Sequence, residues 1–503
     1  MDNNNFASFI EAYKKKIAHL FNNQDSQSPS TTERGMSPQL LSEILETNPL
    51  ATFIPKEYGG FGGNISEMLT LLETSSYQSL PLSLMMGING ALFLQPVANY
   101  GQEEAKKAVF ERILHHKGMG GLMITEPDYG SEALKMQTNF SKKGDDYHIK
   151  GLKHWAGLTG RANFWLMTAR EKNPSGDLER DISFFIHDAR NGGIEVEEYF
   201  NNLGLYLLPY GRNRVDIHVP ASYKLTPKST GVGLMLDLLH RSRFQFPGMA
   251  TGFLRRLLDE ALLHSQNRVV GGINLLGYDQ VKERLSQIQS YYTVSSAMSS
   301  FISENIPKEK DLARMDLVAN SVKTIVTDYM QAAAQSFLQL VGAKGYRLDH
   351  LAGRAIIDSR PFQIFEGSND ILYQQITEST FKFMRKTKVS VFYDFLKDYK
   401  YTSKASEYFK GLFNFQVDPK LPQRKSIQLG QIIARLISMN MTIELGIKGF
   451  NKEMISSSIT TLQHEINAIA SSYNMIKTAD FIEDYKTGSR WLDYLTPAPV
   501  SNR

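Results

Sequence analysis

The spacing of apolar residues changes twice along this chain of 503 residues, and that change limits the folds open to it. Up to about residue 117 the apolar residues recur every three or four positions, which indicates helices. From residue 118 to about 225 the apolar runs are short and partly alternating, as in Val215, Ile217 and Val219. No helical stretch separates these runs, so we expect antiparallel strands joined by turns rather than a helix crossing between parallel strands.

Helical spacing returns after Gly231 and continues toward the end of the chain. The apolar faces that carry this prediction are Leu254, Leu257, Leu258, Ala261 and Leu262; Val318, Val322, Ile325 and Tyr329; and Ile459, Leu462, Ile466, Ile469, Tyr473 and Ile476. The last of these predicts a seam that packs against another helix. We expect it to pack on the protein core, with a partner subunit and a membrane surface as the alternatives.

The predicted fold class is therefore α+β, in four parts. A helical domain spans residues 1–117 and a β-domain spans residues 118–230. A helical bundle follows at residues 231–385, and an additional helical region occupies residues 386–503.

Composition excludes several classes of site. The 56 basic and 52 acidic residues leave a net charge of +4, which gives no argument for a nucleic-acid partner. The absence of cysteine excludes disulfides, thiolate metal sites and cysteine nucleophiles. The adjacent His115 and His116 cannot share one helix face and are expected in solvent. We predict no metal site.

No targeting or membrane segment is expected. The first residues lack a long apolar run after their charges, unlike a signal peptide. The most apolar long stretch, residues 427–450, contains Arg435, Glu444 and Lys448, so it is expected to be a buried helix of a soluble protein. The expected location is the cytoplasm.

The chain lacks the common nucleotide-binding motifs and contains five other local motifs. There is no GxGxxG after a strand and no phosphate-binding P-loop. Instead the chain contains IPKEYGG at 54–60, ITEPDYGS at 124–131, GLKHW at 151–155 followed by GRAN at 160–163, QLVGAKGY at 339–346, and DSRPFQIFEGSNDI at 358–371. In order and spacing these segments resemble the acyl-CoA dehydrogenase superfamily, whose motifs are PxEYGG, TEPxAGS, GxKxWITNGxxA, QxxGGxGY and RDxxxxxIYEGTxEI. The resemblance covers about residues 40–385.

This resemblance implies a fold and an activity. The fold has a barrel-like β-domain between two helical domains, with FAD as the cofactor and no nucleotide-binding Rossmann motif. The activity is α,β-dehydrogenation of an acyl thioester, carried by coenzyme A or by an acyl-carrier protein (class EC 1.3). In the family a glutamate removes the pro-R α-proton, the β-hydride passes to flavin N5, and an electron-transfer flavoprotein or O2 reoxidises the flavin. Homodimers or homotetramers are implied.

The motifs place the site residues. Glu366 falls on the catalytic base, and partial burial beside Phe365 and Gly367 is expected to raise its pKa. The cofactor-binding positions are Thr125, Gly130, Ser131, Trp155, Arg268, Gln339, Gly342, Ala343 and Ser368; the substrate-binding positions are Ser131, Arg243 and Gly367. The alternatives are that Glu366 is an ordinary residue at a helix start capped by Ser368, that Trp155 packs in the core, and that Arg268 is a solvated helix residue.

The sequence departs from the family pattern at three informative positions. Gly157 stands where the family has the threonine that bonds flavin N5, unless Thr159 or a backbone group replaces that donor. His240 replaces an aspartate that helps to hold coenzyme A. Ala343 replaces a glycine, and an alanine at positive φ would be strained.

These departures keep two further functions open beside the dehydrogenase. The first is a flavin-dependent monooxygenase or oxidase on the same fold, acting on a biosynthetic intermediate. The second is a scaffold that has lost flavin and acts through its C-terminal helices.

Overall fold

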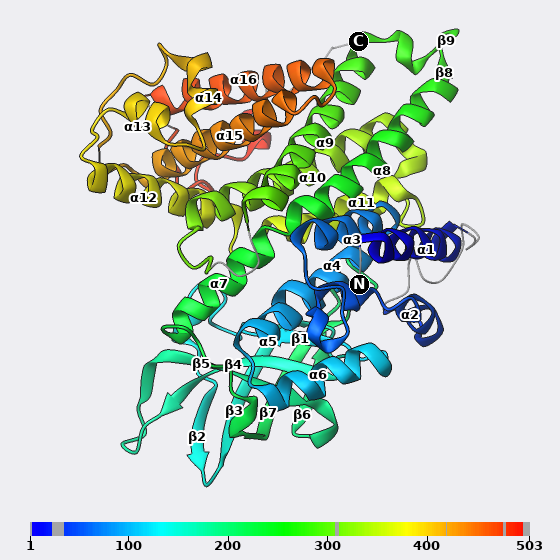
Figure 1. Cartoon of the computed structure of the whole chain (residues 1–503). Helices are drawn as coiled ribbons and strands as arrows, with labels where there is room; N and C mark the ends of the chain where they lie inside the picture. Colours follow the sequence, from blue (N-terminus) through cyan, green and yellow to red (C-terminus); the bar gives the residue numbers. More distant parts are fainter. Residues whose placement is uncertain (1–2, 23–34, 307–310, 419, 476–478, 496–503) are drawn as a thin grey trace, which may run out of the picture.

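The computed structural model describes residues 3–22, 35–306, 311–418, 420–475 and 479–495. The chain begins with helices packed beside the centre of the molecule (Figure 1). They are α1 (Asn3–Asn22), α2 (Pro38–Leu45), α3 (Ile65–Gln78), α4 (Leu80–Asn89), α5 (Gln95–Tyr100) and α6 (Glu103–His115). A π-helical turn, Gly90–Leu94, joins α4 to α5. His115 and His116 are exposed, as expected.

The β-domain lies at one end of the molecule (Figure 1). Its strands are β1 (Gly120–Met123), β2 (Asn139–Lys143), β3 (Asp146–Gly157), β4 (Phe164–Lys172), β5 (Leu178–Asp188), β6 (Ile194–Tyr199) and β7 (Tyr210–Pro220). They form one sheet in the order β1-β4-β2-β3-β7-β6, with β5 also paired to β4. The expectation of antiparallel pairing throughout is wrong at two places, because β1 and β2 each run parallel to β4. Other strands lie between the partners along the chain, since β2 and β3 separate β1 from β4 and β3 separates β2 from β4. The chain has therefore turned back before each parallel pair forms.

The alternating residues of β7 set which face of the sheet is buried. Val215, Ile217 and Val219 are buried, whereas Asp216 and His218 are exposed, as their spacing predicts. The β3–β7 pairing runs antiparallel and regular up to Lys153, where the register shifts before Ala156. This irregularity redirects the end of β3, which carries Trp155.

The helical bundle contains α7 (Gly231–Arg243), α8 (Phe246–Asn267), α9 (Asp279–Asn305), α10 (Asp316–Val341), α11 (Leu351–Ser359) and α12 (Asn369–Thr387), with a ribbon of β8 (Val269–Val270) and β9 (Ile273–Asn274) after α8. The predicted face of α10 is buried in full. On α8 the prediction is wrong for Leu262, which is 40% exposed because it lies at the edge of the stripe near the end of the helix.

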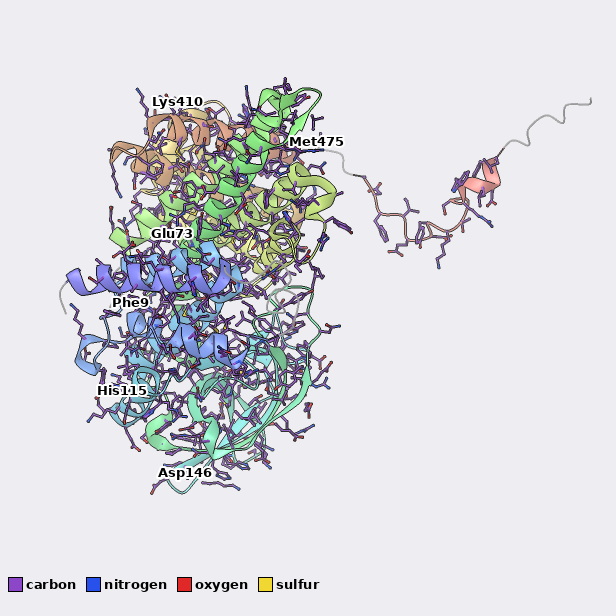
Figure 2. All side chains as sticks on the ribbon, turned by 90° about the vertical axis from the view of Figure 1, so that its right-hand side faces the viewer. Phe9, Glu73, His115, Asp146, Lys410 and Met475 are labelled. Atoms are coloured by element: carbon purple, nitrogen blue, oxygen red, sulfur yellow. The ribbon has the colours of Figure 1, made fainter. Side chains whose placement is uncertain are left out.

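The additional helices pack on the bundle. They are α13 (Phe392–Asp398), α14 (Ser403–Ser406), α15 (Gln423–Ile447) and α16 (Lys452–Asn474). Helix α15 contacts α9, α10 and α12, and α16 contacts α15 and α9 (Figure 1). The seam of α16 is buried at Leu462 and Ile466, while Ile476 lies outside the described residues. Residues 479–495 extend beyond this body (Figure 2) and expose several aromatic side chains.

One helical stretch, Leu80–Tyr100, is long and apolar enough to cross a membrane by length and composition, and 94% of its most apolar window is buried inside the protein. Residues 427–450, the stretch predicted to be a buried helix, lie mostly in α15, and their apolar face is buried. The burial of Leu80–Tyr100 is typical of a core helix.

Candidate functional site

Glu366 occupies a strained turn between two helical segments. The turn follows the 3₁₀ segment Arg360–Gln363 and precedes α12. Its backbone φ is +54° at Glu366 and +92° at Gly367. A glutamate in the left-handed region is uncommon and persists only when its surroundings hold it there.

Two buried cations hold this turn by its backbone. Arg243 Nη2 donates to the carbonyl oxygen of Glu366 at 2.7 Å, and Arg243 Nη1 donates to Asn320 Oδ1 at 2.6 Å. Lys323 Nζ donates to the carbonyl oxygen of Gly367 at 2.9 Å and to Asn369 Oδ1 at 2.8 Å. Charge-assisted hydrogen bonds of this kind are stronger than neutral ones. The two successive carbonyls are therefore fixed from α7 and α10.

The carboxylate of Glu366 is left partly open. Its Oε1 accepts a hydrogen bond from Ser242 Oγ at 2.7 Å. Its Oε2 is buried and has no hydrogen-bond partner among the described residues. Burial raises the pKa of Glu366, and the effect of burial exceeds the opposing effects of Ser242, Arg243 and Lys323. The group is a carboxylate of increased basicity with one free oxygen.

Burial at this turn also shifts the pKa of Lys323. Burial, reinforced by the charge of Arg243, lowers the pKa of Lys323 to about 7. Sequence reasoning did not find Lys323, because a lone lysine on a helix carries no local signal of burial. Ser368 occupies the N-cap position of α12, but its side chain makes no capping hydrogen bond.

Trp155 stands on the β-domain side of the site. Its φ is +54°, and it lies where the β3–β7 register shifts. Its side chain is 54% exposed, so packing in the core does not explain its position. The indole lies 4.6 Å from the ring of Phe200 and 6.3 Å from the ring of Tyr210, between centroids. One aromatic face is therefore available to a planar ligand.

Thr159 does not replace the missing threonine at position 157. Its hydroxyl is fully buried, donates to the Ala156 carbonyl at 2.7 Å and accepts from Asn213 Nδ2 at 3.1 Å. The side chain is thus committed inside the sheet. Gly157 itself adjoins the ring of Tyr210, because a Cβ at this position would lie 3.3 Å from Tyr210 Cε1.

The segment that contains Thr125 is anchored by an ion pair that sequence reasoning missed. Lys153 Nζ lies 2.9 Å from Glu126 Oε1, and both side chains are buried. Glu126 also accepts from the backbone N–H groups of Gln137 and Thr138. Although burial raises the pKa of Glu126, Lys153 and these donors outweigh it and lower the pKa overall. The signal was present, since Glu126 lies inside the TEP motif and Lys153 is two residues before Trp155.

The same anchor positions the exposed part of the loop. The Thr125 carbonyl accepts from the His154 backbone N–H at 2.8 Å, which joins the loop to β3. Thr125 is partly buried, whereas Gly130 and Ser131 are exposed.

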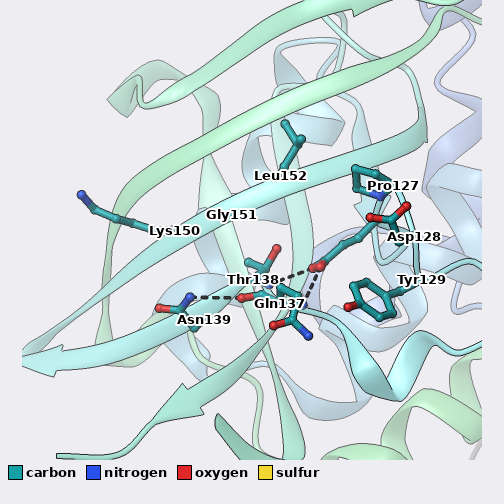
Figure 3. Close-up of a pocket in the computed structure, with 10 residues that line it drawn as sticks. Pro127, Asp128, Tyr129, Gln137, Thr138, Asn139, Lys150, Gly151 and Leu152 are labelled. Carbon is teal, nitrogen blue, oxygen red and sulfur yellow. Dashed lines mark hydrogen bonds between the residues drawn. The ribbon is translucent and has the colours of Figure 1, made fainter. Parts of the chain in front are cut away.

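A cavity of about 340 Å³ lies against this loop. Its walls come from the segment after β1, from β2 and from β3 (Figure 3). The lining residues are Glu126, Pro127, Asp128, Tyr129, Gln137, Thr138, Asn139, Lys150, Gly151 and Leu152. Neither Glu366 nor Trp155 is among them, so this cavity belongs to the β-domain alone.

A second group of candidate residues lies at the ends of α8 and α10. Arg268, Gln339, Gly342 and Ala343 are all exposed. His264 on α8 hydrogen-bonds the Leu340 backbone and senses the charges of Arg268 and Lys344, so the two helix ends are neighbours. The left-handed residue is Gly342, with φ +72°, and Ala343 has no positive φ. The replacement of glycine by Ala343 therefore causes no backbone strain.

His240 is a buried residue that stabilises the bundle and does not lie at the surface. It is buried, and its Nδ1 lies 2.7 Å from the Leu312 carbonyl oxygen. Burial, together with the charge of Arg243, lowers the pKa of His240 to about 4. A neutral histidine inside the bundle does not substitute for an exposed aspartate. Among the described residues, no group of three or more His, Cys, Asp or Glu side chains could hold a metal ion.

The structure therefore brings together Glu366, Gly367, Ser368 and Arg243, and it adds Ser242 and Lys323 to them. Trp155 and Thr125 lie on the β-domain side, where the backbone N–H of His154 donates to the Thr125 carbonyl. Arg268, Gln339, Gly342 and Ala343 form a separate exposed group.

Three domain models of one family match the chain. Acyl-CoA dehydrogenase, N-terminal domain, matches residues 11–117; the middle domain matches residues 121–216; and the C-terminal domain matches residues 229–381. Curated relatives include the mitochondrial very long-chain specific acyl-CoA dehydrogenases of Mus musculus and Homo sapiens. The first is 21% identical over 73% of this chain, and the second is 20% identical over 72%. Each match spans only 56% of the relative's own length.

Solved structures share the fold. An acyl-CoA dehydrogenase from Bacillus anthracis, complexed with FAD, is 17% identical and superposes with a TM-score of 0.74 over 94% of this chain and 88% of its own. Such coverage extends into the additional helices. Butyryl-CoA dehydrogenase from Megasphaera elsdenii is 19% identical, with a TM-score of 0.65 over 74% of this chain and 98% of its own. The prolyl acyl carrier protein oxidase AnaB is 18% identical, with a TM-score of 0.65 over 75% and 99%.

Proposed function

The chain belongs to the acyl-CoA dehydrogenase family, and we propose that it is an FAD-dependent oxidoreductase that dehydrogenates an acyl thioester between its α and β carbons. The observation that carries this proposal is Glu366, a basic carboxylate with a free Oε2, held in a strained turn by Arg243 and Lys323. Strain of this kind concentrates at functional sites.

The residues present fit FAD. Trp155 offers an exposed aromatic face at the end of β3, and Thr125 lies on the neighbouring loop. At the ends of α8 and α10, the exposed Arg268 and Lys344 provide positive charge for a pyrophosphate, as guanidinium groups commonly do. Exposed Gln339, Gly342 and Ala343 suit contact with the cofactor of a second subunit, which supports a homodimer or homotetramer. FAD, when bound, would supply the hydride acceptor that no side chain provides.

Glu366 performs the proton transfer in this proposal. Oε2 accepts the α-proton, while Ser242 fixes the carboxylate through Oε1. The backbone N–H of Glu366 donates to the thioester carbonyl, where negative charge develops. Arg243 and Lys323 keep both groups in position through the carbonyl oxygens behind them, and Gly367 lets the thioester approach the backbone closely.

A flavin-dependent oxidase or monooxygenase is the second candidate function. It is favoured by the Gly157 position, where the Thr159 hydroxyl is committed to the Ala156 carbonyl and supplies no replacement donor. An oxidase among the structural neighbours, named for a prolyl acyl carrier protein, makes a carrier-protein thioester a reasonable substrate class. The acceptor would then be O2 rather than an electron-transfer flavoprotein. For both functions we propose a cytoplasmic location.

The test is the visible spectrum of the purified protein, followed by anaerobic addition of acyl-CoA and acyl-carrier-protein thioesters. We expect bound flavin that bleaches with a thioester. Glu366→Gln should bind FAD equally but bleach about 10²–10⁴ times more slowly, the usual contribution of a general base. Unchanged bleaching in Glu366→Gln would refute the role of Glu366. Flavin that a carrier-protein thioester reduces and O2 then reoxidises would support the oxidase. Flavin that no thioester reduces would support the monooxygenase, and failure to bind FAD would leave a non-catalytic scaffold.

A further inference from the structure

Tyr210 lies between the two halves of the site, although no motif marks it. It is the first residue of β7 and pairs with Gly157, the last residue of β3. Its ring lies over that glycine, because a Cβ at position 157 would be 3.3 Å from Tyr210 Cε1 and 3.7 Å from Cζ. The ring of Trp155 is 6.3 Å away, between centroids. The tyrosine ring and Ile88 Cδ1, which would lie 2.9 Å from that Cβ, together occupy the space that a larger side chain at Gly157 would need.

The backbone fixes where this ring can go. The Tyr210 carbonyl accepts from the Phe200 backbone N–H at 2.8 Å. Phe200 in turn packs on Trp155. Tyr210 is therefore held by the sheet on one side and by an aromatic cluster on the other, with little freedom to swing away.

The hydroxyl of Tyr210 has no hydrogen-bond partner within the described part of the chain. Tyr210 is partly buried, so its hydroxyl is available to donate to a ligand at this junction. Burial raises the pKa of Tyr210, and the second cause is the negative charge of Glu366. The phenol, from the β-domain, and the carboxylate, from the helical bundle, therefore lie close enough to interact. Glu366 Oε2 is buried and, among the residues that the structure describes, without a hydrogen-bond partner at this junction.

We propose that Tyr210 is a cofactor-binding residue whose hydroxyl donates a hydrogen bond to the flavin edge beside Gly157. The inference rests on the proposed function, because the resemblance is what places flavin N5 next to position 157. A hydroxyl is thus restored to that edge from the neighbouring strand, and the loss of the family's threonine is compensated. Gly157 is then required, because a threonine there would collide with the ring that replaced it.

The first experiment compares FAD binding to apoprotein of the wild type, Tyr210→Phe and Tyr147→Phe. Tyr147 lies on the same sheet near the start of β3, packs against Phe140 and Phe185 and serves as the control. Tyr210→Phe should raise the Kd for FAD about 3- to 10-fold and shift the flavin absorption bands, while Tyr147→Phe changes neither. An unchanged Kd and spectrum in Tyr210→Phe would overturn the inference. If the wild type binds no FAD, the proposed function itself fails.

The second experiment tests the coupling between the two positions. Gly157→Thr should weaken FAD binding in the wild-type background, because its side chain meets the Tyr210 ring. In the Tyr210→Ala background the same substitution should instead improve FAD binding, since it restores a hydroxyl and meets only the flexible end of Ile88. Equal effects of Gly157→Thr in the two backgrounds would contradict the proposed replacement of one hydroxyl by the other.

Discussion

Glu126 and Glu366 are both carboxylates withdrawn from water, but the basic side chains beside them bind different atoms. At Glu126 the lysine binds the carboxylate itself, and two backbone N–H groups complete the shell. At Glu366 the cations bind the backbone carbonyls, and the carboxylate receives one hydroxyl. The pKa of Glu126 is consequently lowered and that of Glu366 is raised.

The difference separates an anchor from a base. A carboxylate whose hydrogen bonds are satisfied is stable as an ion and has no tendency to accept a proton. A carboxylate with a free oxygen in a buried site accepts a proton more readily. A nearby cation therefore does not by itself make a carboxylate a poor base. The effect depends on whether the cation donates to the carboxylate or to a backbone carbonyl.

The largest effect is expected where the anchor is broken. Lys153→Met leaves the Glu126 charge buried without its partner, which should destabilise the fold by about 3–5 kcal/mol. Chemical denaturation measures the loss. The double variant Lys153→Met with Glu126→Gln should recover most of it, because no buried charge remains. A single variant as stable as the wild type would show that Glu126 is not an anchor.

A smaller effect is expected where the base is only mispositioned. Arg243→Lys cannot reach both the Glu366 carbonyl and Asn320, because a lysine lacks the planar fork of arginine. Flavin reduction by substrate should slow about 10- to 100-fold, or about 1.4–2.7 kcal/mol, with FAD affinity unchanged. The matched control is Arg255→Lys on α8, whose ion pair with Glu73 is half exposed. Loss of FAD binding in Arg243→Lys would instead assign the arginine to the cofactor.

The smallest effect is expected on the pH dependence of stability. The change in stability at pH 7 should have opposite signs in the Glu366 and Glu126 variants. Because the folded pKa of Glu366 is raised, its contribution is present below the unfolded pKa near 4.5 and is lost as pH rises through the folded pKa. Glu366→Gln should therefore match the wild type in acid and be more stable than it at pH 7.

For Glu126, with a lowered pKa, the stabilisation is present at pH 7 and is lost as pH falls through the folded pKa. Glu126→Gln should therefore be less stable than the wild type at pH 7 and approach it in acid. Thermal unfolding of both variants, from neutral pH to well below the unfolded carboxyl pKa of 4.5, checks the pair. The same sign for both would mean that the two carboxylates are not distinguished as the structure indicates.

The order of the elements can be predicted from the amino-acid sequence alone. The change from helical to alternating spacing places the β-domain between helices, because burial of one helix stripe or one sheet face depends on residues that are close in the chain. The motif around Glu366 was also readable, since its residues are contiguous. The same motifs assign Glu366 as the base and Gln339 and Gly342 as cofactor-binding positions, and these roles stay predictions.

How these residues are held follows from contacts between segments that are far apart in the chain. Arg243 and Glu366 are 123 residues apart, and Lys323 and Gly367 are 44 residues apart. No local pattern distinguishes a lysine that enters a core from one that remains in solvent. Tyr210 was missed for the same reason, because its position over Gly157 follows from the register of β3 on β7. Spacing along the chain predicts which faces of an element are apolar. The hydrogen-bond partner of a buried charged side chain depends instead on which distant segment of the backbone the fold places beside it.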